Sequence, residues 1–151
     1  MTVFNFDRQP ATPTMPAPPR ADQIEIRVNA DAAWLPSLRV VAADLATRAD
    51  FDLDEVADLR MAVDQACAEL VSAADSGAVL VCRFAMDRDR ITVTATVPVS
   101  GPTAIPRDTF GWRVLTTLVD EVEVLDGADP SQGAGCMLCL RLGMLRQAAP
   151  R

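Results

Sequence analysis

A long stretch with helical periodicity in the middle of the chain constrains the fold more than any other feature. Apolar residues recur along it three or four positions apart, at Val56, Leu59, Val63, Ala66, Leu70 and Ala73. This spacing predicts an α-helix that lays one face on a hydrophobic core. Asp52 and Glu55 predict a capping box at the start of this helix, and residues 75–77 predict its end.

Two polar residues of the same stretch, Gln65 and Glu69, lie away from the apolar stripe. Because they are four positions apart on a helix, their side chains converge and can form one edge of a ligand pocket. An ordinary amphipathic helix with a solvated polar face shows the same pattern. The pattern by itself leaves both interpretations open.

The segments around this helix predict an α+β fold. Apolar and alternating runs predict strands at residues 23–29, 79–86, 91–97, 120–124 and 136–142. Helical periodicity predicts further helices at residues 36–48 and 112–119. This order leaves all helices free to cover one face of a mixed, mainly antiparallel sheet, so we expect a two-layer sandwich.

The 151 residues fit one domain with a single core. Residues 1–22 are rich in proline without a sustained period, which predicts a flexible tail. We expect residues 23–145 to form the folded domain and residues 146–151 to be a frayed end. No apolar run reaches the length of a membrane span and no signal-peptide order is present, so we expect a cytoplasmic protein without membrane contact.

Charge and missing residue types exclude several functions. The net charge of -7 argues against direct nucleic-acid binding and favours a basic protein partner. The sequence contains no His, no Lys and no Tyr. These absences exclude Ser-His-Asp and Cys-His catalysis, a P-loop lysine and a phosphorylated histidine. Any catalysis must therefore depend on carboxylates, a metal ion or cysteine.

The four cysteines are Cys67, Cys82, Cys136 and Cys139, and we expect them to be reduced thiols. Cys136 and Cys139 have the spacing of a redox pair. They fall in a predicted strand, however, where residues three apart point to opposite faces, so a local disulfide is geometrically poor. Without His or a second CxxC motif, zinc is not expected.

Three separated segments resemble the RsbW-like anti-sigma factors and serine-protein kinases, which have the GHKL-type, histidine-kinase-like ATPase fold. Residues 62–69 resemble the N-box helix, residues 111–124 the second glycine box, and residues 133–142 the closing glycine turn and strand. The resemblance covers residues 23–142. It implies ATP and magnesium as cofactors, a sigma factor and an anti-anti-sigma factor as partners, and a homodimer. The exposed edge of the first strand is a reasonable place for such a dimer.

The resemblance also implies a nucleotide site, formed by Gln65, Glu69, Gly101, Gly111, Gly133 and Gly135. In the family, the N-box supplies a glutamate that activates a nucleophile and, four residues later, an asparagine that holds magnesium. Gln65 and Glu69 occupy those positions here. An amide cannot act as a general base, whereas the Glu69 carboxylate suits magnesium.

The glycine boxes depart further from the family. Residues 97–102 retain only Gly101 and lack the aspartate that recognises adenine, and Thr109 stands where the second box has the partner of Gly111. Glycines matter there because backbone amides approach a phosphate only where no side chain intervenes. The resemblance therefore implies an altered nucleotide site.

Three functions stay open. The first is an anti-sigma factor in transcriptional stress response, which sequesters a sigma factor and is released by an anti-anti-sigma antagonist. The second is an active ATP-dependent kinase that phosphorylates a serine of the antagonist, with Glu69 and Asp64 in shifted roles. The third is a GHKL-fold nucleotide sensor. The sequence favours the first, because the kinase requires three departures from the family pattern to be compensated.

Two aromatic residues near the second glycine box, Phe110 and Trp112, are expected to pack rather than to stack on a ligand. Aromatic side chains exposed at this place would instead indicate a protein interface.

Overall fold

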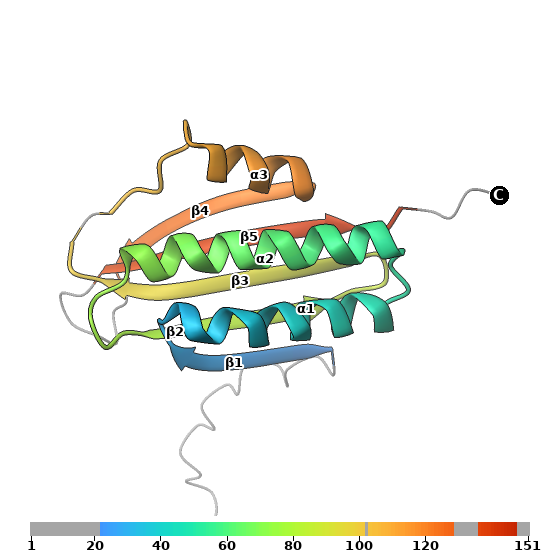
Figure 1. Ribbon diagram of the computed structural model, residues 1–151, viewed down its shortest axis with the longest axis horizontal. Helices are drawn as coiled ribbons and strands as arrows, with labels where there is room; N and C mark the ends of the chain where they lie inside the picture. Colours follow the sequence, from blue (N-terminus) through green and yellow to red (C-terminus); the bar gives the residue numbers. More distant parts are fainter. Residues whose placement is uncertain (1–21, 102, 129–135, 148–151) are drawn as a thin grey trace, which may run out of the picture.

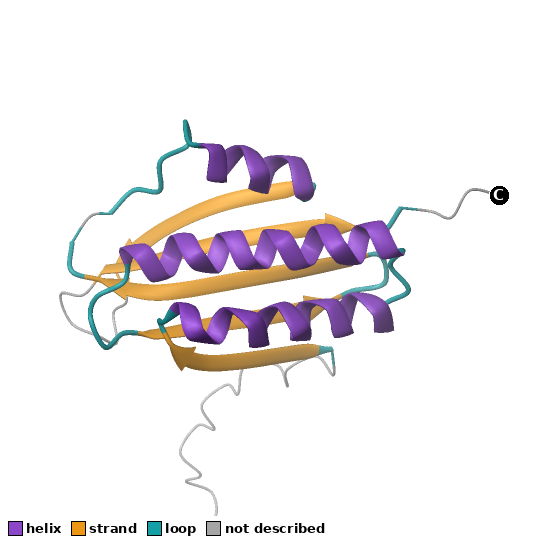
Figure 2. Cartoon of the chain, viewed as in Figure 1, coloured by secondary structure: helices purple, strands orange, loops and turns teal. Residues whose placement is uncertain are grey.

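The computed structural model describes residues 22–101, 103–128 and 136–147. Three helices cover one face of a five-stranded sheet, which gives two layers (Figures 1 and 2). The strands are β1 (Gln23–Asn29), β2 (Val79–Met86), β3 (Arg90–Val99), β4 (Glu121–Ala128) and β5 (Cys136–Leu145). The helices are α1 (Leu35–Arg48), α2 (Leu53–Ala73) and α3 (Phe110–Leu118), and the short 3-10 helix η2 (Ala32–Trp34) precedes α1.

The sheet has the order β1-β2-β3-β5-β4, and every neighbouring pair is antiparallel. The expected α+β two-layer sandwich is confirmed. None of the helices in the described ranges is long and apolar enough to cross a membrane. The predicted tail, residues 1–22, lies outside the described residues except for Asp22.

The core lies between the helices and the sheet. The stripe of α2 contributes Leu59, Val63 and Leu70, all of which are inaccessible to solvent. In the sheet, alternate residues of a strand point toward the helices. Strand β3 shows this clearly, because buried and half-buried positions alternate along its whole length. This alternation places one face of the sheet against the helices and leaves the other uncovered.

Helix α2 begins as the sequence predicts. The Asp52 carboxylate accepts from the backbone N–H of Glu55, and the Glu55 carboxylate accepts from that of Asp52, which completes the capping box. Glu55 also accepts a hydrogen bond of 2.8 Å from the backbone N–H of Gln147. The start of α2 therefore holds the last described residue of the chain.

The C-terminal end is ordered further than the sequence predicts. Leu145 belongs to β5, and the backbone N–H of Arg146 donates to the Asp89 carbonyl at 2.7 Å. The Arg146 side chain pairs with the Asp89 carboxylate at 2.9 Å. Of the residues 146–151 that were expected to fray, Arg146 and Gln147 are held by contacts to distant residues that a local sequence pattern does not show, and residues 148–151 lie outside the described residues.

The cysteines are free thiols, as expected. Cys136 packs against the core, whereas Cys139 lies between the buried Leu138 and Leu140 and so points to the opposite face. The expectation that these two residues cannot pair locally is confirmed. In the core, a hydrogen bond with Cys67, together with burial, raises the pKa of the Cys82 thiol. Burial in apolar surroundings makes such thiols unreactive.

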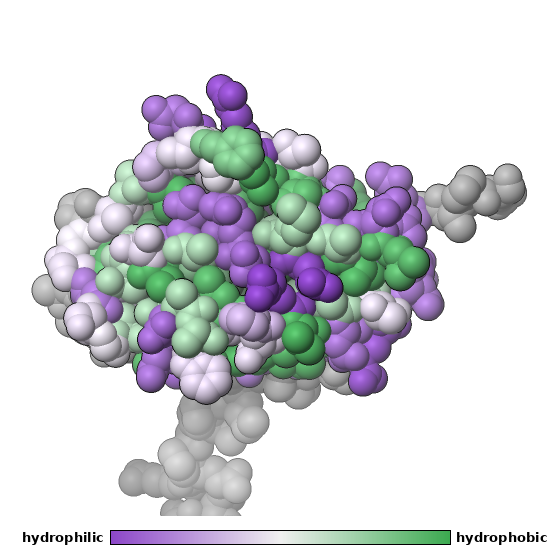
Figure 3. Space-filling model, in the orientation of Figure 1, coloured by the Kyte–Doolittle hydropathy of each residue, from purple (hydrophilic) through white to green (hydrophobic). Residues whose placement is uncertain are grey.

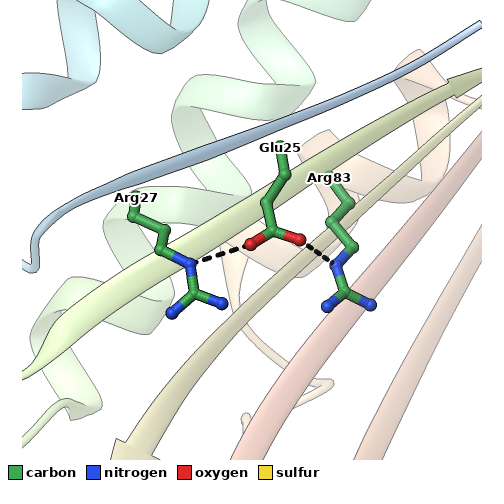
Figure 4. A network of polar contacts seen from close by, with 3 residues as sticks. All are labelled: Glu25, Arg27 and Arg83. Carbon is green, nitrogen blue, oxygen red and sulfur yellow. Dashed lines mark hydrogen bonds and ion pairs between the residues drawn. The ribbon is translucent and has the colours of Figure 1, made fainter. Parts of the chain in front are cut away.

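The uncovered face of the sheet carries charged side chains. Glu25 accepts hydrogen bonds of 2.8 Å from both Arg27 and Arg83, and Figure 4 shows its carboxylate between the two guanidinium groups. Arg27 and Arg83 hold the pKa of the Glu25 carboxyl below its ordinary value. The three-residue network therefore persists at neutral pH and is lost only as the pH falls through the lowered pKa.

Candidate functional site

The two N-box residues meet on α2. The Gln65 amide nitrogen donates a hydrogen bond of 3.0 Å to a carboxylate oxygen of Glu69, and both residues are half-buried. One turn of helix separates the two Cα atoms, so the contact follows directly from their spacing. The predicted convergence of these side chains is confirmed, while a ligand at this point stays a prediction.

The first turn of α3 lies directly against this pair. A Cβ atom added to Gly111 would lie 2.5 Å from the Gln65 amide nitrogen and 2.5 Å from a Glu69 carboxylate oxygen. Thr109 begins α3 by accepting a hydrogen bond of 3.2 Å from the backbone N–H of Trp112. Helix α3 thus starts at Phe110 rather than at the predicted Trp112, because the Thr109 hydroxyl caps it.

Two other residues considered for the site, Gly101 and Asp64, are not part of this contact. Gly101 lies in the loop after β3, and a Cβ atom there would have no neighbour within 4 Å. Asp64, which the kinase interpretation requires, forms an ion pair of 3.6 Å with Arg39 on α1. Gly133 and Gly135 lie outside the described residues. Of the four predicted nucleotide-site residues that the structure describes, Gln65, Glu69 and Gly111 lie together and Gly101 lies apart.

A side chain at position 111 would require the ends of the Gln65 and Glu69 side chains to move. ATP and magnesium at this pair stay a prediction. One oxygen of Glu69 is also engaged by Gln65. Among the described residues, no group of three or more Cys, Asp or Glu side chains could hold a metal ion.

Three cavities lie on the other side of the molecule, along the uncovered sheet face. The largest of them, about 870 Å³, is lined in part by Asn29, Val79 and Met137. Two smaller ones, about 370 and 550 Å³, share residues such as Thr92 and Arg141. Gln65, Glu69, Gly101 and Gly111 line none of these three cavities, so they lie apart from the predicted site.

The expectation that Phe110 packs against the protein is wrong, because 81% of its surface is exposed. Trp112 is half-buried, and the Arg107 guanidinium lies over its ring at 5.4 Å from the centroid. The buried residue of α3 is Leu115, which lies about 140° around the helix from Phe110 at 100° per residue. Thr109 is the signal that could have corrected this expectation. If it had been taken as the N-cap, α3 would have been predicted to begin at Phe110, with Phe110 on the solvent side of the helix.

The comparisons with known proteins agree with this fold. No protein-family model matches the sequence. The chain is 34% identical over 131 residues to the anti-sigma-F factor RsbW of Mycobacterium tuberculosis (strain CDC 1551 / Oshkosh), an alignment that covers 85% of this chain and 76% of that protein. It is 23% identical over 127 residues to the serine-protein kinase RsbW of Bacillus cereus (strain B4264), covering 70% and 79% of the two chains.

A solved structure shows the same fold. The crystal structure of the RsbU and RsbW domains of Rv1364c from Mycobacterium tuberculosis matches 89% of this chain with a TM-score of 0.54 and 19% sequence identity. This chain spans 34% of that one, so the match concerns one part of it. This structural match shows the GHKL-type fold of an RsbW domain, and the identity of 34% to the mycobacterial anti-sigma-F factor shows that this chain belongs to the RsbW family.

Proposed function

We propose that the chain is an anti-sigma factor that sequesters a sigma factor by direct protein binding, is released by an anti-anti-sigma antagonist, and has an altered nucleotide site. The names of the two relatives support the general role. The contact of Gly111 with Gln65 and Glu69 supports the altered site. This contact is the observation on which we favour sequestration over kinase activity.

The chemistry of the pair supports the same proposal. Phosphoryl transfer to a serine requires a group that accepts the hydroxyl proton and a metal ion that bridges the phosphates. The Gln65 amide has no basic atom for the first role, and its N–H donates to Glu69, the one residue proposed for the second. The side chains of both residues lie against Gly111 of α3, and one of the two Glu69 carboxylate oxygens is engaged by Gln65.

Sigma-factor binding is tested by mixing the purified chain with each purified sigma factor of its own genome. We expect one of them to form a complex that survives size-exclusion chromatography. The acidic net charge of -7 favours a basic surface on that sigma factor, so the association rate should fall as salt increases. Failure of every sigma factor to bind would overturn the proposal.

Nucleotide binding is tested by calorimetry with ATP and magnesium. The proposal expects no heat of binding at millimolar ATP, because residues 97–102 retain one glycine of the first box and Gln65 engages an oxygen of Glu69. Binding that is lost in Glu69→Ala would instead favour the kinase or the nucleotide sensor. Transfer of labelled phosphate to a candidate antagonist would then distinguish the kinase from the sensor.

We also propose a homodimer formed through β1. The strand order places β1 at an edge of the sheet, where its outer backbone groups have no neighbouring strand in the described chain. Such an edge is available for pairing with a second copy. Sedimentation equilibrium should show twice the monomer mass, and Ile24→Arg on this strand, where Ile24 is 41% exposed, should lower it. A monomer at all concentrations would contradict this arrangement.

A further inference from the structure

The uncovered face of the sheet is charged at one end. Residues that pair across neighbouring strands point to the same face, so the register identifies the side chains of each end. One row across the strands consists of Glu25, Arg83, Thr94, Arg141 and Glu123. Ion pairs join its charged members, as Figure 4 shows for Glu25 and Arg83. An apolar segment is therefore not expected to bind at this end.

The other end of the same face is apolar and borders the cavity of about 870 Å³. This apolar end consists of one residue of η2 and four outward residues of β2, β3 and β5, namely Trp34, Val79, Val81, Pro98 and Met137. Trp34 is 46% exposed, Val79 is 42% exposed, and the other three are half-buried. None of the five belongs to the core between the helices and the sheet. In the described part of the chain, an apolar cavity of this size is thus open to solvent.

The helix side of the molecule differs from the apolar end. Its exposed apolar residues include Val40 on α1 and Met61 on α2, neither of which lines the cavity. Figure 3 shows hydrophobic and hydrophilic residues intermingled over these two helices. A short apolar segment therefore meets a mixed surface over the helices and a mainly apolar lining at the apolar end.

The sequence before β1 contains residues that suit an apolar cavity. Residues 3–6 read Val-Phe-Asn-Phe and include two of the five phenylalanines of the chain. In an extended backbone, Phe4 and Phe6 share one side, so both rings can enter the same cavity. Residues 10–19 contain five prolines, which suit a spacer and not a further strand of the sheet. The sequence thus connects an aromatic segment to the sheet through a spacer.

The attachment point and the length of the spacer fit the distance to the cavity. The Asp22 carbonyl accepts a hydrogen bond of 3.0 Å from the backbone N–H of Met86, which holds the start of the fold at the charged end. Asn29, which lines the cavity, lies six residues along β1 from Gln23, a distance of about 20 Å. Residues 6–21 span about 20–24 Å as a flexible chain and about 50 Å as a polyproline helix. A tether of matching length gives its free end a local concentration on the order of millimolar.

We propose that residues 3–6 bind the apolar end of the uncovered face in the same chain, with the rings of Phe4 and Phe6 in the cavity. Burial of apolar surface drives this contact, and the tether allows a weak contact to be occupied without a partner protein. The predicted nucleotide-site residues that the structure describes do not line this cavity, so the contact is separate from that site. A protein that binds the apolar end must first displace the segment.

Photo-crosslinking tests the location of the segment. p-Benzoylphenylalanine replaces Phe6 in the purified full chain, and the same residue replaces Gln9, three positions nearer to the fold, as the matched control for tethering alone. We expect position 6 to crosslink within one chain to peptides of the apolar end, at least about threefold more often than position 9. No crosslink at position 6, equal frequencies at both positions, crosslinks to the helix side, or crosslinks that join two chains would overturn the proposal.

Alkylation of a natural thiol measures how often the segment is bound. Cys139 lies on the uncovered face two residues from Met137, whereas Cys136 of the same strand packs against the core. A segment bound at the apolar end therefore shields Cys139 from iodoacetamide and leaves the reaction of Cys136 unchanged. Mass spectrometry reports the two rates in the same sample.

The test variant carries Phe4→Ser and Phe6→Ser in the full chain, and the control variant carries Thr12→Ser and Thr14→Ser in the spacer. If the segment is bound for about two thirds of the time, the test variant should raise the alkylation rate of Cys139 about threefold. Circular dichroism checks that both variants are folded. An unchanged rate at Cys139, or an equal rise at Cys136 or in the control variant, would reject the contact. Both experiments omit sigma factor and nucleotide, so their outcome is independent of the proposed function.

Discussion

Replacing Phe84 by alanine is expected to lower the free energy of unfolding by about 3–5 kcal/mol. Phe84 is on β2, is inaccessible to solvent and is among the largest fully buried side chains. Its register partners are Ile24 on β1 and Val93 on β3, so a truncated side chain leaves a cavity bordered by three strands and the helix layer. A loss of this size is a large part of the stability of an ordinary domain, about 5–15 kcal/mol.

Urea unfolding followed by circular dichroism measures this loss. Val79→Ala on the same strand is the control, because Val79 is 42% exposed and points to the uncovered face. It should cost less than about 1 kcal/mol. Equal shifts of the two midpoints at an unchanged m-value would show that Phe84 does not occupy the core position described.

The helix-facing side of the sheet could be predicted because it depends on local periodicity. The strands at residues 79–86 and 91–97 were predicted from their apolar and alternating runs, and in the structure Leu80, Phe84 and Val93 are the kind of alternate residue that faces the helices. The capping box of α2 was equally local, since its two residues are three positions apart.

The ends of the strands could not be predicted in this way. The predicted strand at residues 91–97 ends before Pro98, yet in the structure Pro98 continues β3 opposite Met137 of β5. The last register pair of β3 with β2 is Thr96 with Val81, so at Pro98 β3 pairs only with β5. The N–H that proline lacks is therefore not missed by a hydrogen-bond ladder with β2. The sequence of β3 alone does not show where β2 ends.

In the candidate site, too, one contact could be predicted from local sequence and another could not. The convergence of Gln65 and Glu69 follows from helix geometry and was predicted. The position of Gly111 against them depends on the packing of α3 on α2, which no local pattern describes. The family resemblance assigns Gly111 to the nucleotide site, which stays a prediction, and in the structure its missing side chain allows α3 to lie close to Gln65 and Glu69 of α2.

Replacing Gln65 by glutamate is expected to lower the free energy of unfolding by about 1–3 kcal/mol at neutral pH. The natural amide donates to Glu69 over 3.0 Å, and the variant places two carboxylates at this distance in a half-buried contact under α3. Two like charges so close favour uptake of a shared proton. The lost stability should therefore be partly regained as the pH falls, which is opposite to the acid response of the Glu25 network.

Gln65→Ala is the matched control, because it removes the hydrogen bond without adding a charge, and its loss should show little pH dependence. If Gln65→Glu were as stable as the natural chain at pH 7, the contact of α2 with α3 would not be as tight as described. The same variant tests the altered nucleotide site. The substitution supplies a carboxylate that can accept a proton at position 65. Phosphate transfer to an antagonist by Gln65→Glu, absent from the natural chain, would support the proposal that this site has lost kinase chemistry.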